Sequence, residues 1–150
     1  MRTADEWFRD YGQSHRDPTN KRIHWICVPL IVWSVTALIW SIPSPFDWLN
    51  WAVAMAILAE AWYLALSIPL AIGLGLFLLL CLGLCALIES SVAVPLWQIG
   101  LAVFVLSWIG QFIGHHIEGK KPSFFKDLQF LLIGPAWLLG FVYRKLGWRY

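Results

Sequence analysis

The sequence predicts an all-α fold, a polytopic membrane helical bundle that forms one integral membrane domain over residues 1–150. The chain is 59% hydrophobic and 13% charged, with a mean hydropathy of +0.66, which is typical of membrane proteins. Four apolar runs each approach the roughly 20 residues that a helix needs to cross a bilayer. The three loops between these runs contain none of the 11 Lys and Arg residues.

Residues 3–15 are predicted to form a short interfacial helix. Thr3 and Glu6 fit a capping box, in which each side chain binds the backbone N–H of the other residue. One apolar face follows at helical spacing, made of Trp7, Phe8, Tyr11 and His15. Such a helix lies in the membrane interface or covers the cytoplasmic mouth of the bundle.

Four transmembrane helices are predicted at about residues 23–42, 48–68, 69–88 and 94–114. Pro18 separates the first of them from the N-terminal helix, and Asn20 is its expected N-cap. A last segment, about residues 128–143, is shorter and is expected to be broken at Gly134-Pro135. It is either a re-entrant segment, which we favour, or a complete fifth span.

The basic residues predict the orientation of the chain in the membrane. They gather before the first span, in the 115–127 loop and at the C-terminus. The positive-inside rule places the N-terminus and this loop in the cytoplasm and favours a cytoplasmic C-terminus. The polar N-terminus predicts no cleavable signal peptide. The short chain without a retention signal favours the bacterial inner membrane over the endoplasmic reticulum.

A polar stripe at the end of the fourth span is the strongest candidate site. Gln111, His115 and Glu118 fall at i, i+4 and i+7 of a helix, so they share one face. His116 is rotated by about 100° from His115 and points elsewhere. Polar groups on an apolar helix usually face a bundle interior or a site.

All four histidines are expected near the cytoplasmic face, because His15 and His24 flank the start of the first span. If the first and fourth spans pack together, these imidazoles converge with Glu118. Neutral imidazole with carboxylate suits iron, zinc or manganese. A packing or hydrogen-bonding role for each single histidine is the alternative. Membrane desaturases with two irons use more histidines than this chain has.

Other residues allow simpler interpretations. Glu60 is the one charged residue deep within a span, and it is either functional or a protonated side chain bonded to a neighbouring helix. Four basic side chains near the candidate site have two possible roles: they bind an anionic head group, or they only determine the topology of the chain in the membrane. These residues are Lys21, Arg22, Lys120 and Lys121. The cysteines lack metal-ligand spacing with the histidines. We find no phosphate-binding glycine loop, no Ser-His-Asp arrangement and no nucleic-acid module.

Two stretches of the chain resemble the signatures of the 2-hydroxy fatty acid dioxygenase family of small membrane proteins. His15, Asn20, His24 and Pro29 match H-x4-N-x3-H-x2-G-x-P, with Cys27 where the signature often has glycine. The second stretch runs from Gln111 to Pro122. The segment Leu132-Ile-Gly134-Pro135 resembles a third block.

The resemblance implies an Fe(II)-dependent α-oxidation, in which a 2-hydroxy fatty acid and O2 give a fatty acid one carbon shorter. It implies that His15, His24 and His115 are the catalytic iron ligands. As a hypothesis on these residues, we expect Glu118 to be a fourth or outer ligand and Asn20 and Gln111 to orient the ligands by hydrogen bonds. Arg22 or Lys120 is expected to hold the substrate carboxylate. The expected partners are the substrate, O2 and membrane lipid. Two other classes stay open, a non-enzymatic transporter or lipid-binding scaffold and a zinc-dependent lipid hydrolase.

Overall fold

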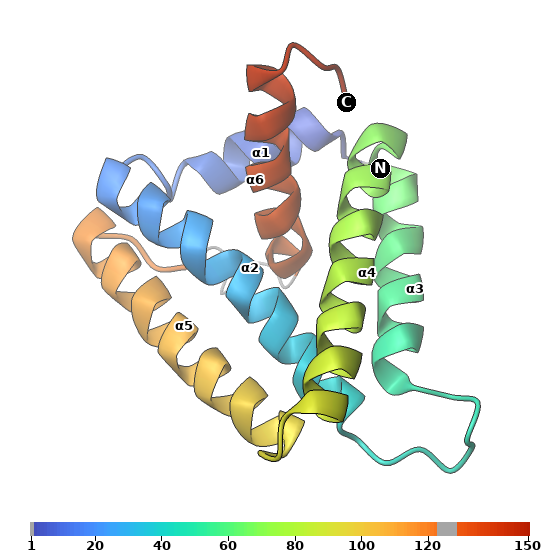
Figure 1. Cartoon of the computed structure of the whole chain (residues 1–150). Helices are drawn as coiled ribbons and strands as arrows, with labels where there is room; N and C mark the ends of the chain where they lie inside the picture. The colour runs from blue at the N-terminus through green and yellow to red at the C-terminus, as the bar shows by residue number, and fades with distance from the viewer. Residues whose placement is uncertain (1, 123–128) are drawn as a thin grey trace.

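The computed structural model describes residues 2–122 and 129–150, and within these ranges every regular element is an α-helix, which confirms the all-α part of the predicted fold class. Lys126 of the predicted cytoplasmic loop and Leu128 at the start of the predicted last segment lie outside the described residues. Figure 1 shows the helices in chain order: α1 (Ala4–Gly12), α2 (Pro18–Trp40), α3 (Trp51–Leu66), α4 (Ile68–Ser91), α5 (Leu96–Glu118) and α6 (Phe130–Lys145).

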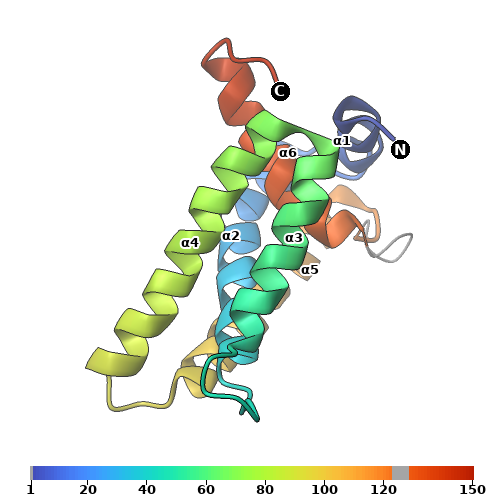
Figure 2. The same cartoon turned by 90° about the vertical axis from the view of Figure 1, so that its right-hand side faces the viewer.

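Three of these helices, α2, α4 and α5, are long and apolar enough to cross a membrane. Helix α3 occupies the predicted second span but has 16 residues, fewer than the roughly 20 that cross a bilayer upright. The four helices run between the same two ends of the protein, with the 41–50 and 92–95 loops together at one end (Figures 1 and 2). The structure therefore supports a multi-span bundle, and the count of four spans stays a prediction.

Helix α1 begins with the predicted capping box, since Thr3 and Glu6 exchange side-chain and backbone hydrogen bonds. Its aromatic face is buried, with Trp7 edge-on to Phe130 of α6 at 5.2 Å between ring centroids. The helix thus covers the end of the bundle, one of the two placements expected for it.

Helix α2 begins at Pro18, and its N-cap is Asp17 rather than Asn20, so that prediction is wrong. The Asp17 carboxylate accepts hydrogen bonds from the backbone N–H groups of Thr19 and Asn20. Proline fits the first position of a helix, because its missing N–H would have no partner there in any case. The helix starts earlier as a result, and Asn20 is buried inside its first turn.

Helix α6 runs unbroken through Gly134 and Pro135, so the predicted break at this pair is wrong. A proline removes one backbone hydrogen bond, and here tertiary contacts bury both residues of the pair. The Tyr150 hydroxyl lies 3.4 Å from Asp5. Both ends of the chain therefore lie on one side of the protein, as the favoured topology requires (Figure 1).

Helices α2 and α5 pack closely through glycines. A Cβ atom at Gly110 would lie 2.7 Å from the Cys27 sulfur, and one at Gly100 would lie 3.1 Å from Ala37. A Cβ atom at Gly114 would likewise come too close to the Asn20 side chain. Cys27 fills the space that Gly110 leaves, which explains how the chain accommodates a larger residue where the family signature often has glycine. This close approach brings the start of α2 beside the end of α5.

Candidate metal centre

Three of the four histidines form a buried cluster where α2 and α5 meet. His15 comes from the loop between α1 and α2, His24 from the second turn of α2, and His115 from the last turn of α5. One ligand atom from each lies within 4.8 Å of the others, a spacing that a single metal ion can bridge. Their exposed fractions are 1%, 2% and 4%. His116 is exposed on another face of α5.

Backbone carbonyl groups determine which nitrogen of two imidazoles is protonated. The Nδ1 atom of His15 lies 2.7 Å from the Tyr11 carbonyl oxygen, and that of His24 lies 3.1 Å from the Asn20 carbonyl oxygen. A carbonyl only accepts hydrogen bonds, so each Nδ1 donates and each Nε2 carries a lone pair. Metal-binding histidines are commonly oriented in this way.

The two Nε2 atoms of His15 and His24 then face each other at 2.8 Å. Two lone pairs at this distance repel each other and cannot form a hydrogen bond, so the arrangement is stabilised only by a cation between or beside them. Burial lowers the pKa of His15 to about 4, which disfavours a proton in that role at neutral pH. The donor set therefore fits a metal ion.

His115 completes the cluster from the other helix. Its ring centroid lies 5.0 Å from that of His15 and 5.1 Å from that of His24. Its Nδ1 atom is buried and has no hydrogen-bond partner in the described part of the chain. A buried polar atom without a partner is costly, and ligation of an ion would satisfy the imidazole.

Glu118 ties the histidine-bearing loop to the end of α5. Its carboxylate accepts hydrogen bonds from the backbone N–H groups of Arg16 at 2.9 Å and Asp17 at 2.7 Å. The Asn20 side-chain amide donates to the same carboxylate at 3.2 Å and to the Ser14 carbonyl at 3.2 Å. In this structure Glu118 thus lies outside the group of three histidines, and its role as a metal ligand stays a prediction.

The remaining predicted residues lie around the cluster in different ways. Gln111 lines a cavity together with His24 and His115. Lys120 donates a hydrogen bond to the Gln13 carbonyl at 2.7 Å and lines a basic hollow on whose wall His115 also lies. Arg22 is exposed on α2, away from the buried face.

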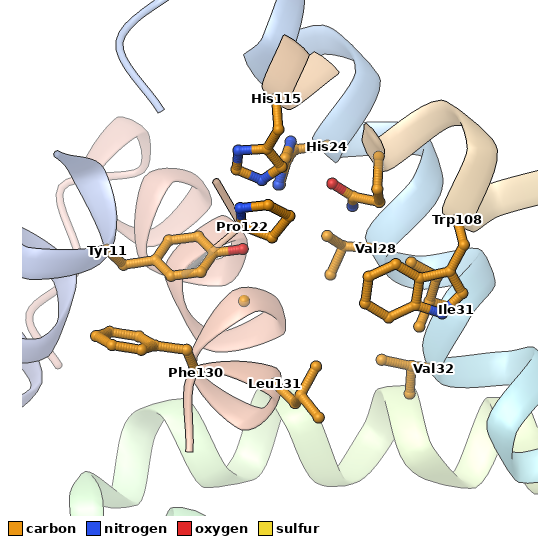
Figure 3. Close-up of a pocket in the computed structure, with 12 residues that line it drawn as sticks. Tyr11, His24, Val28, Ile31, Val32, Trp108, His115, Pro122, Phe130 and Leu131 are labelled. Carbon is orange, nitrogen blue, oxygen red and sulfur yellow. The ribbon is translucent and has the colours of Figure 1, made fainter. Parts of the chain in front are cut away.

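The cavity beside the histidines has a polar end and an apolar end. Figure 3 shows His24 and His115 together at one end, and Val32, Phe130 and Leu131 toward the other. Helices α1, α2, α5 and α6 all contribute to its wall. Such a cavity suits an amphiphile whose head lies at the imidazoles and whose chain lies among apolar side chains.

Two aromatic side chains that pack on His15 were not predicted as part of the site. The Tyr11 ring stacks on the His15 imidazole at 4.1 Å between centroids, and Trp137 of α6 lies 5.3 Å from it. The position of Tyr11, one helical turn before His15, was the available signal. Nothing in the sequence indicated that α6 would supply Trp137.

Comparison with known proteins identifies relatives of two kinds. The chain is 31% identical over 139 residues to the 2-hydroxy-palmitic acid dioxygenase MPO1 of Saccharomyces cerevisiae, covering 91% of this chain and 78% of that protein. It is 33% identical over 135 residues to the putative manganese efflux pump MntP of Crocosphaera subtropica, covering 85% of this chain and 66% of that protein. No solved structure matches the chain.

The profile of one protein family, described as 2-hydroxy-palmitic acid dioxygenase Mpo1-like, matches residues 1–146. That range includes both signature stretches and all three clustered histidines. The chain therefore belongs to the Mpo1-like family.

Proposed function

We propose that this protein is an Fe(II)-dependent dioxygenase that converts a 2-hydroxy fatty acid to the fatty acid one carbon shorter. The observation that carries the proposal is the opposed pair of Nε2 lone pairs of His15 and His24, with His115 beside them. Family membership indicates the class of reaction, and this arrangement offers the means to hold the metal.

His15, His24 and His115 would hold the iron, because three neutral imidazoles form a suitable donor set for Fe(II). Bound Fe(II) would supply O2 activation and Lewis acidity toward substrate oxygens. The carbonyl groups of Tyr11 and Asn20 keep two imidazoles in the correct tautomer. The hydrogen bonds that the Glu118 carboxylate accepts from the backbone N–H groups of Arg16 and Asp17 keep the His15 loop against α5.

The proposed reaction balances without an external reductant. The bond between the carboxyl carbon and C2 breaks, the carboxyl carbon leaves as CO2, and C2 becomes the new carboxyl carbon. One O2 takes up the four electrons released, and the remaining product is water. The enzyme should therefore turn over with Fe(II), O2 and the substrate alone.

The chain's own residues would bind the substrate in two parts. The apolar part of the cavity accepts the acyl chain next to C2, and Gln111 holds polar groups near the histidines. Lys120 and Arg22 are exposed near this end of the bundle, and we propose that they attract the carboxylate from the membrane surface. The site would face the cytoplasm, because the basic residues gather at this end.

The direct test is a mass-spectrometric assay of purified protein with 2-hydroxypalmitate, Fe(II) and O2. We expect a fatty acid of 15 carbons, one O2 consumed for each product formed, and close to one iron for each chain. Replacing His15, His24 or His115 with alanine should remove both iron and activity, whereas His116→Ala, an exposed histidine of the same helix, should keep both. Full activity of purified His115→Ala would refute the proposal.

A second candidate function is metal transport, which the similarity to the putative manganese efflux pump favours. In that case the histidine cluster would be an ion-binding site on a transport route. Cells that express the protein would then export manganese, and purified protein would leave 2-hydroxypalmitate unchanged. Manganese content of expressing cells, measured with and without His24→Ala, distinguishes the two functions.

A further inference from the structure

The chain has four tyrosines, and only one hydroxyl group lacks a protein partner in the described residues. Tyr63 donates to the Leu132 carbonyl at 2.9 Å, and Tyr143 donates to the Pro69 carbonyl at 2.7 Å. Tyr150 bonds to Asp5 and Arg144. The Tyr11 hydroxyl has no such bond, although Tyr11 is only 6% exposed. Buried tyrosine hydroxyls usually have a partner, so this one is available to a ligand.

The hydroxyl of Tyr11 points into the cavity beside the histidines. Figure 3 shows its ring extending from α1 toward the middle of the cavity, with the oxygen at the inner end, close to Pro122 and on the side of the cavity where Val28 lies. The ring itself is held by stacking on His15 and by an edge contact with Trp137 at 5.2 Å. The hydroxyl is thus fixed in place by contacts that do not use its hydrogen.

Gly134 of α6 makes room for this hydroxyl. A Cβ atom at position 134 would lie 3.1 Å from the Tyr11 oxygen, a tight contact that would push it from its place. Gly134 also lines the cavity. The absence of a side chain at this position leaves space around the oxygen for a bound molecule.

The cavity lacks a charged side chain among its lining residues in the described ranges. Apart from an ion held by the histidines, the groups of this cavity that can meet a carboxylate are therefore neutral donors. A phenolic hydroxyl is protonated at neutral pH, because its ordinary pKa is about 10, and it donates well to an anion.

We propose that Tyr11 is a substrate-binding residue whose hydroxyl donates a hydrogen bond to the carboxylate of the fatty acid in the cavity. The inference rests on the proposed function, which supplies the acidic amphiphile. Tyr11 would orient the carboxylate at the histidine end, with the acyl chain directed toward Val32 and Leu131.

The test is Tyr11→Phe, which keeps the ring and its stacking and removes only the hydroxyl. Binding is measured without O2 for three ligands: 2-hydroxypalmitate, palmitate and 1,2-hexadecanediol. We expect both acids to bind about 10- to 100-fold more weakly to the variant, since a hydrogen bond to a charged group is lost. Binding of the diol, which has no carboxylate, should be unchanged, and iron content should stay at the wild-type level. Gly134→Ala should weaken binding of both acids in the same direction.

Tyr143→Phe is the matched control, because it removes a hydroxyl bonded to a backbone carbonyl. It should lower the melting temperature without changing affinity for either acid. Unchanged acid binding in Tyr11→Phe would overturn the proposal, and so would a loss confined to 2-hydroxypalmitate, which would mean that Tyr11 contacts the 2-hydroxyl group instead. Failure of the wild-type protein to bind either acid would also overturn it.

The outcomes separate this inference from the proposed function. Wild-type protein that binds both acids through Tyr11 but forms no product would contradict the dioxygenase and leave the Tyr11 contact supported. Wild-type turnover with equal kcat and KM in Tyr11→Phe would support the dioxygenase and contradict the role of Tyr11.

Discussion

The histidine end of the bundle and the α3–α4 hairpin differ in how many polar groups they bring together. At the histidine end, defined by the three clustered histidines and the loop that Glu118 holds, many polar groups gather, and Glu118 bonds to groups about 100 positions earlier in the chain. The buried His115 Nδ1 atom, which has no partner in the described part of the chain, lies at the candidate metal centre there. The two helices of the hairpin lie side by side in Figure 2. The surfaces that they turn toward each other carry a single charged group, Glu60. One of its carboxylate oxygens is buried without a partner among the described residues.

The surfaces of the two regions differ in the same way. Outward side chains of the hairpin are large and apolar, with Ile72, Leu76 and Leu79 exposed by 61%, 65% and 65%. Exposed apolar surface of this kind suits contact with lipid. From this contrast we propose that the histidine end carries the chemistry and that the hairpin anchors the protein in the membrane. The following predictions test that assignment, in order of expected effect.

The largest effect should come from the histidines. His15→Ala, His24→Ala and His115→Ala should each reduce iron content to background and lower turnover more than about 100-fold, because the proposed iron would lose one of its three ligands. Iron analysis and the product assay on the same preparations measure this. His116→Ala should change neither value, and its loss of iron would show that the cluster has been assigned incorrectly.

The next effect concerns Glu118, whose carboxylate accepts backbone N–H bonds at the His15 loop. In Glu118→Gln, the amide can offer only one acceptor oxygen, so the loop is held less firmly and iron affinity should fall about 10-fold. Iron titration followed by activity measures this change. Glu89→Gln, which alters an exposed carboxylate bonded to Trp40 at the far end of α4, is the control. Complete loss of iron in Glu118→Gln would instead identify Glu118 as a direct ligand.

A smaller effect is expected from the α2–α5 contact. In Gly114→Ala the new methyl group would meet the buried Asn20 side chain, so the free energy of unfolding should fall by about 1–3 kcal/mol. Gly83→Ala on α4 is matched, because a Cβ atom there meets nothing within 4 Å. It should leave stability unchanged or slightly higher, since alanine favours helix. Thermal unfolding in detergent measures the stability of both variants. An equal loss of stability in Gly114→Ala and Gly83→Ala would contradict the close packing of α2 against α5.

Sequence patterns predicted the local features of the histidine end well. Helical spacing placed Gln111, His115 and Glu118 on one face, and the capping box located the start of α1. What they missed depends on contacts between distant residues. The groups that bind Glu118 lie 101 and 102 positions earlier in the chain, and no periodicity indicates such a pair.

The errors have physical causes of the same kind. Glycine followed by proline is typical of a helix break, so the sequence predicts a break at Gly134-Pro135. Helix α6 is nevertheless continuous, because this pair is buried against α1 and α2. Asp17 takes the cap position from Asn20, because Pro18 fits the first position of the helix. Local propensity is a weak determinant where tertiary packing decides the outcome.

The smallest effect is expected for Glu60, and it decides whether the hairpin has a chemical role. A Cβ atom at Gly75 would lie 3.1 Å from the Glu60 carboxylate, so this side chain packs on α4 rather than toward the histidines. Glu60→Gln should therefore leave iron content unchanged and alter turnover by less than about 0.5 kcal/mol in activation free energy. The product assay and manganese content of expressing cells should be measured together. If Glu60→Gln abolished manganese export while the histidine variants kept it, function would lie in the hairpin, and the contrast between the two regions would be reversed.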